Sequence, residues 1–332
     1  MHDVALHAAD DELVSAVAVA EHPPRQRHRP VRQPAVGKRE LHLLAGVAVA
    51  ALTVAFAAQH ATNGARAVLD ARLLQAGAGT DAGIVDVESE QLSLARAISF
   101  THGVAQDVAA HDSPALNTLV APVQADSTVP MVDVVLPNGS VLLAVRSKGA
   151  PMPVSSHAGL PALKWALSHA HGPRGGRLSQ VVVFASGATL VTISPIVEEQ
   201  TPVGAVLAMT PLADVLGRLS QEVGADLTAY DGNGNPVDTT AEFQPPPIDR
   251  TVVRALLGGG AVVTRSIHGS QREKLGRLIV DHTADAVLGV SLEDDSAAVG
   301  RTVAIYAGIG LTCTVLILAT FWARFVTTRS RE

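Results

Sequence analysis

The sequence predicts an α+β chain in which two tandem units with antiparallel sheets follow a long N-terminal helix, flanked by two transmembrane helices. Three observations predict this class. Two long apolar stretches contain no charged residue, the segment between them changes from helical to strand periodicity, and one order of elements occurs twice within that segment. The 332 residues carry 31 Asp plus Glu, 25 Lys plus Arg and one cysteine. This composition excludes a disulfide framework and argues against nucleic acid as a partner.

The two apolar stretches lie at 41–58 and 302–323. At a rise of about 1.5 Å per residue, roughly 18 to 22 helical residues cross a hydrocarbon core of about 30 Å. We therefore predict a transmembrane helix at each stretch. A cleavable signal peptide is the alternative for the first, although residues 1–40 precede it. A buried core helix is the alternative for the second.

Basic residues gather before the first stretch and after the second. By the positive-inside rule both termini lie in the cytoplasm, and the central segment lies outside a two-pass cell-membrane protein. Residues 1–40, rich in proline and arginine, are predicted to be a disordered basic cytoplasmic tail, and 324–332 a short one. The basic part of the first tail either contacts the anionic lipid bilayer or serves only to set topology.

A long helical stalk is predicted at 60–112. Helical periodicity covers 60–76 and resumes from 84 to 111, where apolar residues share one face. The glycine-rich stretch "GAGTDAG" at 77–83 is predicted to interrupt it. These glycines follow no strand, so they do not form a dinucleotide-binding loop.

The segment 113–224 is the first predicted unit. Its strand hairpin at 132–147 turns through an Asn-Gly pair, which tolerates positive φ. A helix at 160–170, three strands at 180–212 and a helix at 213–224 follow, the last ending at a glycine.

The segment 225–300 repeats that order. It has a hairpin at 227–240 around "DGNGN", a helix at 250–259 and three strands at 261–293. Chance similarity in a chain rich in valine and alanine is the alternative. Because element order and local sequence both match, we predict two copies of one unit.

This organisation, with "PI…VGAVLAMTPL" closing the first unit and "DAVLGVSLEDD" closing the second, resembles the double Cache (dCache) extracytoplasmic sensor domain of bacterial transmembrane receptors. The resemblance covers about 60–300. It implies two tandem PAS-like (Cache) units, with 113–224 membrane-distal and 225–300 membrane-proximal. It also implies a small-molecule ligand in the distal unit and a homodimer.

Members of that family that sense amino acids carry an Arg-x-Trp-Tyr cluster and a late Asp in the distal unit. Here Trp165 has no adjacent arginine or tyrosine, and Thr210 stands where the Asp is expected. An aromatic cage for an ammonium group needs several rings, and Trp165 and Tyr230 are the only Trp and Tyr between the two stretches. The ligand is therefore predicted to be neither an amino acid nor an amine.

Candidate ligand contacts lie in the distal unit. A small carboxylate, a reasonable ligand, would need an arginine or lysine in a mostly apolar pocket, and Arg146 and Lys164 are the best-placed cations. Trp165, Ser186 and Thr210 are the other candidates for lining the cavity. The alternative for each is an ordinary surface cation or core residue.

Metal and enzyme signatures are weak. His169 and His171 form a His-x-His pair at a helix end, where interaction with the helix dipole is the alternative to metal binding. "DGNGN" resembles a calcium loop, but Phe243 stands where the bidentate Glu is required. Nucleophile, zinc and phosphate-loop motifs are missing. We predict no catalytic residue, metal site or cofactor, and hence no enzyme.

The predicted function is a membrane-anchored extracytoplasmic small-molecule sensor that transmits ligand binding through its transmembrane helices. Only 324–332 follow the second stretch, so we expect either that a separate signalling protein provides the output or that the chain is a shortened receptor with only its input half. The alternative is an envelope scaffold whose Cache-like units bind a protein partner. A distal pocket of a few hundred Å³, with Arg146 or Lys164 directed inward, would favour the sensor, and a pocket filled by side chains would favour the scaffold.

Overall fold

The computed structural model describes part of the chain. Residues 51–332 form one compact unit and residues 1–50 another. Apart from the start of one helix, the account below concerns residues 51–332. The predicted tail at 1–40 lies outside the described residues except for its last three. The model describes the backbone of 38–329 except 153, 173–174, 268–269 and 282, and the side chains of 38–45, 283–285 and 321–329 are also outside the description.

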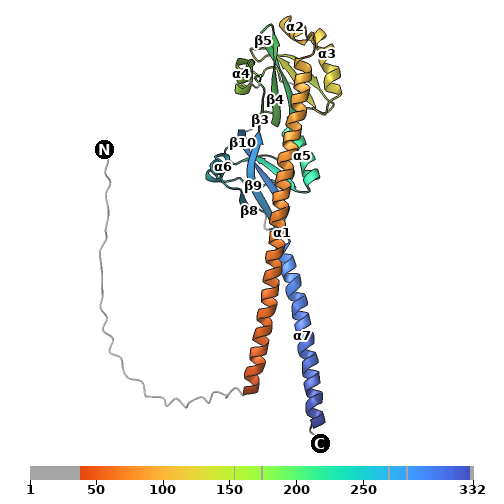
Figure 1. Cartoon of the computed structure of the whole chain (residues 1–332), viewed down its shortest axis with the longest axis vertical. Coiled ribbons are helices and arrows are strands. Elements are labelled where there is room, and N and C mark those ends of the chain that lie inside the picture. The colour runs from red at the N-terminus through yellow and green to blue at the C-terminus, as the bar shows by residue number, and fades with distance from the viewer. Residues whose placement is uncertain (1–37, 153, 173–174, 268–269, 282, 330–332) are drawn as a thin grey trace, which may run out of the picture. The chain divides into compact units, whose positions relative to one another are not determined.

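One helix, α1 (Lys38–Ser99), runs without a break through most of the predicted stalk (Figure 1). It ends earlier than the stalk predicted at 60–112. A positive φ of 95° at Gly103 precedes a separate short helix, α2 (Val104–Ala109). The prediction of one stalk to 112 is therefore wrong beyond Ser99.

The predicted glycine-rich interruption of this helix is also wrong. Gly79 and Gly83 remain helical and face α5 (Leu212–Val223). A Cβ on Gly83 would overlap the Leu219 side chain, and one on Gly79 would lie 3.0 Å from Val223 Cγ1. Glycine inside a helix costs about 1 kcal/mol relative to alanine, but here it permits close packing of two helices. Packing thus overrides the local preference for a break.

The distal sheet has five antiparallel strands in the order β2-β1-β5-β4-β3. One face packs against the end of α1, α2 and α3 (Ser113–Ala125), and the other against α4 (Pro161–Ser168). Asp112 caps α3 by accepting a hydrogen bond from Ala115 N at 3.0 Å. The strands are β1 (Met131–Val135), β2 (Val141–Arg146), β3 (Leu178–Phe184), β4 (Gly187–Glu198) and β5 (Thr201–Pro211).

The proximal sheet repeats this topology as β7-β6-β10-β9-β8. Helix α6 (Arg250–Leu257) packs against one face, and α1 with α5 against the other. Gly224, with a φ of 63°, ends α5 as the sequence predicts. The strands are β6 (Asp226–Tyr230), β7 (Pro236–Thr239), β8 (Val263–Ile267), β9 (Gln271–Val280) and β10 (Thr283–Glu293).

The first hairpin of each unit turns at a glycine used in the same way. Gly139 has a φ of 84° and Gly234 a φ of 87°. His157 N donates to Gly139 O at 2.7 Å, and Ile248 N donates to Gly234 O at 2.8 Å. A Cβ at either glycine would overlap the backbone of the segment that makes this bond. The repeat thus extends from element order to individual hydrogen bonds, and it places His157 and Ile248 at equivalent positions.

The predicted turn at "DGNGN" uses its carboxylate internally. Asp231 Oδ1 accepts hydrogen bonds from Asn233 N at 2.9 Å and Asn235 N at 2.8 Å. Burial acts against ionisation, but these hydrogen bonds hold the pKa of Asp231 below its ordinary value. In the described part of the chain, no group of three His, Cys, Asp or Glu could hold a metal ion.

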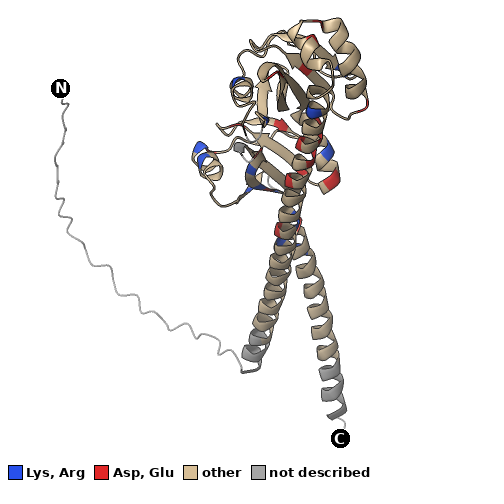
Figure 2. Cartoon of the chain, turned by 45° about the horizontal axis from the view of Figure 1, so that its top comes forward, with Lys and Arg blue, Asp and Glu red and all other residues tan. Residues whose placement is uncertain are grey.

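Helix α7 (Ser296–Arg329) contains the second predicted span. Within the described residues, Ser296–Thr320 is the one helical segment long and apolar enough to cross a membrane, a criterion of length and composition alone. The first predicted span, 41–58, begins among residues whose side chains are outside the description. Figure 2 shows charges of both signs on the helices and strands of the two sheet-containing units, whereas the coloured part of α7 is almost free of them.

Helices α1 and α7 are in contact. Arg66 Nε donates to Ser296 Oγ at 3.4 Å, and a Cβ on Gly300 would overlap Thr62. Movement of α1 at this point therefore changes its packing on α7.

Candidate functional site

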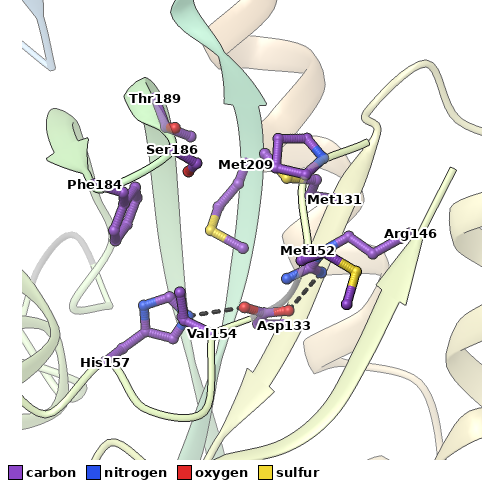
Figure 3. A pocket seen from close by; sticks show the side chains of 11 residues that line it. Met131, Asp133, Arg146, Met152, Val154, His157, Phe184, Ser186, Thr189 and Met209 are labelled. Carbon is purple, nitrogen blue, oxygen red and sulfur yellow. Dashed lines mark hydrogen bonds and ion pairs between the residues drawn. The ribbon is translucent and has the colours of Figure 1, made fainter. Parts of the chain in front are cut away.

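A small pocket lies on the face of the distal sheet that α4 covers (Figure 3). Strands β1, β2, β4 and β5 and the β3–β4 turn form its inner side, and Pro151, Met152, Val154 and His157 form its outer side. Its volume is about 20 Å³, which is room for about one water molecule. Its apolar lining includes Met131, Met152, Phe184 and Met209.

Strand alternation aims β1 into this pocket. The residues Met131, Asp133 and Val135 face the α4 side, while the two valines between them enter the core against α2 and α3. Antiparallel register places Arg146 on β2 opposite Met131. Asp133 and Arg146 are thus two polar residues at the pocket. The backbone hydrogen bond from His157 N to Gly139 O brings His157 to the pocket as the third.

These three polar residues, Asp133, Arg146 and His157, form what we call the Asp133 cluster. The Asp133 side chain is fully buried, with Oδ1 2.5 Å from Arg146 Nη1 and Oδ2 2.8 Å from His157 Nε2. The His157 side chain is 1% exposed and that of Arg146 14%. Arg146 Nη1 also donates to the backbone oxygens of Val132 at 3.1 Å and Val145 at 3.0 Å. The cluster is thus a buried ion pair extended by an imidazole.

Each member of the Asp133 cluster has one polar atom without a hydrogen-bond partner: Arg146 Nε, His157 Nδ1 and Asp133 Oδ1. The last lies close to Arg146 Nη1 as an ion pair, but without hydrogen-bond geometry. Among the described residues, no other buried side-chain nitrogen or oxygen is without a hydrogen-bond partner. A buried polar atom without a partner costs about 1 to 3 kcal/mol, so a molecule that pairs with these atoms would gain free energy.

The outer wall of the pocket is loosely held. The Met152 side chain is 88% exposed and that of Val154 39%, so both bury little surface against the rest of the unit. The Phe184 ring meets His157 edge-on, with centroids 5.8 Å apart. Hydrogen bonds hold the ends of this wall, at Ser147 and at Ser155 and Ser156. The exposed side chains of Met152 and Val154 between them are therefore the part that can move to admit a ligand larger than water.

The opposite face of the same strands is joined to α1 by Gln91, whose side chain is fully buried. Gln91 Nε2 donates to Leu190 O at 3.2 Å and to Thr210 Oγ1 at 2.8 Å, and Thr192 Oγ1 donates to Gln91 Oε1 at 2.8 Å. Thr189 and Met209, the neighbours of Leu190 and Thr210, line the pocket. One residue step along β4 or β5 therefore leads from the pocket to α1.

The predicted contact residues fall in three places. Arg146 and Ser186 line the pocket. Lys164 and Trp165 are exposed on α4, where Trp165 stacks on His169 with ring centroids 4.4 Å apart, and the structure does not bring them to the pocket. Thr210 faces α1 and bonds to Gln91 instead.

Sequence reasoning missed two members of the Asp133 cluster. Asp133 carried a signal, because it is the one charged residue in the strand "MVDVV", all of which is buried. A charge at such a position is found almost only with a partner. His157 carried no comparable signal, because a backbone hydrogen bond to a distant turn positions it.

The proximal sheet buries a second ionic group, which we call the Glu273 cluster. Glu273 Oε1 accepts from Tyr230 Oη at 2.6 Å, and Glu273 Oε2 accepts from Arg265 Nε at 2.6 Å. Arg265 Nη2 donates to Tyr230 Oη and to Pro246 O, both at 2.8 Å, and Nη1 donates to Pro247 O at 3.1 Å. Burial and the Glu273 carboxylate raise the pKa of the Tyr230 hydroxyl, which therefore remains a donor.

No family model and no curated protein sequence matches the chain. Solved structures are similar to it. The extracellular domain of a protein assigned as the histidine kinase vpHK1S-Z8 has a TM-score of 0.50 and 10% identity, covering 71% of this chain and 97% of that one. The ligand-binding domain of the Campylobacter jejuni chemoreceptor Tlp3 with L-valine has a TM-score of 0.46 and 14% identity, covering 72% and 98%. The V. cholerae histidine kinase DctB sensor domain has a TM-score of 0.48 and 8% identity, covering 68% and 97%.

The first of these similarities shows a shared fold. The predicted resemblance to double Cache sensor domains is thus confirmed for the fold, with its long N-terminal helix and two antiparallel sheets.

Proposed function

We propose that this chain is an extracytoplasmic sensor that binds a small molecule in the pocket of the distal sheet. It acts by binding and not by catalysis. The observation that carries the proposal is the Asp133 cluster, whose three residues line a cavity and each have one buried polar atom without a hydrogen-bond partner. Burying charges without satisfying them is destabilising, and a bound ligand that completes the hydrogen bonds offsets that cost.

The signal in this proposal travels through α1. Ligand entry displaces the Met152 and Val154 side chains and shifts β4 and β5, which Gln91 holds against the helix. Helix α1 then changes its packing on α7 at Arg66 and Thr62. Shifts of packed helices by one or two ångströms are sufficient for such switching, provided that the ligand prefers one of the two arrangements.

The proposed setting is a two-pass membrane protein with both termini in the cytoplasm. It acts as a homodimer and passes its signal to a separate protein. A topology reporter inserted after Gly149, in an exposed loop, should be active only outside the cytoplasm. A cytoplasmic signal from that position would reverse the orientation.

A second candidate function is an envelope scaffold that binds a protein partner. The volume of the distal pocket, about 20 Å³, favours it, because side chains already fill most of the space that a metabolite would need. The two candidates differ in whether a small molecule stabilises the protein.

Thermal melting of the full chain in detergent, against organic acids, carboxamides, amino acids, purines and polyamines, tests the sensor. A ligand at 100 times its Kd should stabilise the protein by about 2.7 kcal/mol. His157→Asn should abolish that increment, while His169→Asn, a matched change on the exposed end of α4, should retain it. The absence of any stabilising compound, or an equal loss in both variants, would favour the scaffold.

A further inference from the structure

We infer that the ligand of the distal pocket is an uncharged molecule of the carboxamide class, with a small apolar substituent. This inference rests on the proposed sensor function and names the chemistry of its ligand. It follows from the charge balance of the Asp133 cluster and from its unpaired atoms.

The charges in the pocket are already paired. Asp133 Oδ1 and Arg146 Nη1 lie 2.5 Å apart, and the two side chains are 0% and 14% exposed. A carboxylate that took Arg146 as its partner would leave the Asp133 carboxylate buried beside it. An ammonium group that took Asp133 would in the same way displace the guanidinium. Either exchange leaves a buried charge uncompensated, whereas an uncharged ligand leaves the ion pair intact.

The unpaired atoms define the hydrogen bonds that the ligand has to make. Arg146 Nε–H is a donor, and Asp133 Oδ1 is an acceptor. His157 Nε2 lies 2.8 Å from the Asp133 carboxylate and carries the proton of that bond, so in the neutral ring Nδ1 is an acceptor. With a neutral His157 ring, the residues that line the pocket therefore carry one donor and two acceptors without hydrogen-bond partners. A primary carboxamide offers the complement, a carbonyl oxygen and two N–H groups.

The remaining surface of the pocket limits the rest of the ligand. Met131, Met209 and Phe184 provide apolar contacts. The cavity of about 20 Å³ has to enlarge by outward movement of Met152, which is 88% exposed. A short alkyl or aryl substituent fits this chemistry, and a second charged group does not.

Matched ligands that differ in one property test the inference. Propionamide, propionate, propylamine and N,N-dimethylpropionamide would be titrated into the full chain in detergent, with binding followed by ligand-observed NMR. We expect propionamide to bind at least about tenfold more tightly than the two charged analogues. The dimethyl amide, which has no N–H, should also bind at least about tenfold more weakly.

The outcomes separate the inference from the proposed function. Tighter or equal binding of the carboxylate or the amine overturns the uncharged ligand and leaves the sensor in place. If none of these compounds and no member of the wider library binds, the sensor itself fails. These ligand comparisons need no variant, so they remain decisive whatever a substitution does to folding.

A variant sharpens the test. Arg146→Lys keeps a cation beside Asp133 but removes the Nε–H donor, so carboxamide affinity should fall by about tenfold while the ion pair persists. Lys164→Arg, an equally conservative change on exposed α4, should leave the affinity unchanged. Unchanged affinity in a folded Arg146→Lys protein would show that Arg146 Nε does not donate to the ligand.

Discussion

The distal and proximal units each bury a carboxylate beside an arginine, but only the distal one leaves part of its hydrogen bonding unmade. In the Glu273 cluster, Tyr230 and Arg265 satisfy both carboxylate oxygens, and two proline carbonyls accept hydrogen bonds from Nη1 and Nη2 of the arginine. In the Asp133 cluster one atom of each member is unpaired. Burial of charge is therefore not in itself the mark of a ligand site in this protein. Unsatisfied hydrogen bonding beside a cavity is the better mark.

The equivalent positions show how one fold provides both arrangements. The residue that bonds to the turn glycine is His157 in the distal unit and Ile248 in the proximal one. Ile248 packs with Tyr230 in the core under α6, whereas His157 reaches the pocket. The side chain at this shared backbone position is therefore one difference between the unit with a polar pocket and the unit with a filled core.

The largest expected effect comes from breaking the complete cluster. Glu273→Ala leaves Arg265 and the Tyr230 hydroxyl without their buried partner, and we expect a loss of about 3 to 5 kcal/mol in the free energy of unfolding, measured by chemical denaturation. Glu293→Ala, at an exposed position on β10, is the control and should change it by less than about 0.5 kcal/mol. Similar losses in both variants would show that the Glu273 cluster contributes nothing specific.

A smaller effect is expected when one hydrogen-bonding group leaves the same cluster. Tyr230→Phe keeps the ring but removes the hydroxyl that donates to Glu273 and accepts from Arg265. The expected loss is about 2 kcal/mol in the free energy of unfolding, because the bonds involve charged groups. A neutral result in the same denaturation experiment would mean that the ion pair alone is sufficient.

The corresponding change in the distal unit should cost less. His157→Leu removes one hydrogen bond to Asp133, but it also removes the unpaired Nδ1 from the interior. We therefore expect a loss of about 1 kcal/mol in the free energy of unfolding, roughly half that of Tyr230→Phe. A larger loss than that of Tyr230→Phe would contradict the contrast between an incomplete and a complete cluster.

The smallest effect separates the two hairpins by pH. Asn138 and Asp231 both accept a backbone hydrogen bond at the turn, but only Asp231 titrates. Its folded pKa is below the ordinary value, so its contribution is complete above the unfolded pKa of about 3.9 and is lost as pH falls through the folded pKa. Asp231→Asn should flatten the dependence of unfolding free energy on pH below 5 by at most about 0.5 kcal/mol, because solvent screens this turn. Identical dependence of the unfolding free energy on pH in wild type and variant would show that ionisation of Asp231 does not contribute to stability.

Local signals in the sequence were sufficient for much of the fold. The Asn-Gly hairpin, the end of α5 at Gly224 and the repeated order of elements all arise from short-range rules. The glycines at 77–83 were misread because the contact that makes them useful, against Leu219, is far away in the sequence. Periodicity within α1 holds no information about that neighbour.

The candidate site was harder to predict, because it depends on register and on contacts over long separations. Thr210 was chosen by position, but adjacent strand residues face opposite sides, so Met209 lines the pocket and Thr210 contacts α1. Arg146, chosen as a candidate ligand contact, lies in the lining of the pocket, but its pairing with Asp133 depends on which residues the β1–β2 hairpin aligns. Asp133 stands out in the sequence as the one charge in an apolar strand, but its partners Arg146 and His157 are set by contacts over long separations.

The side chain of Gln91 also sets limits on how α1 can move. Its amide is fully buried, and it holds bonds to two neighbouring strands at once. A helix has 3.6 residues per turn, so rotation by one residue turns this side chain by about 100° and breaks all of these bonds together. Small displacements strain the bonds without releasing them, and larger ones have to cross a barrier. In the proposed sensor, α1 should therefore occupy one of two discrete positions, so a single glutamine makes the response of each molecule all-or-none while ligand occupancy sets the proportion of molecules in each position.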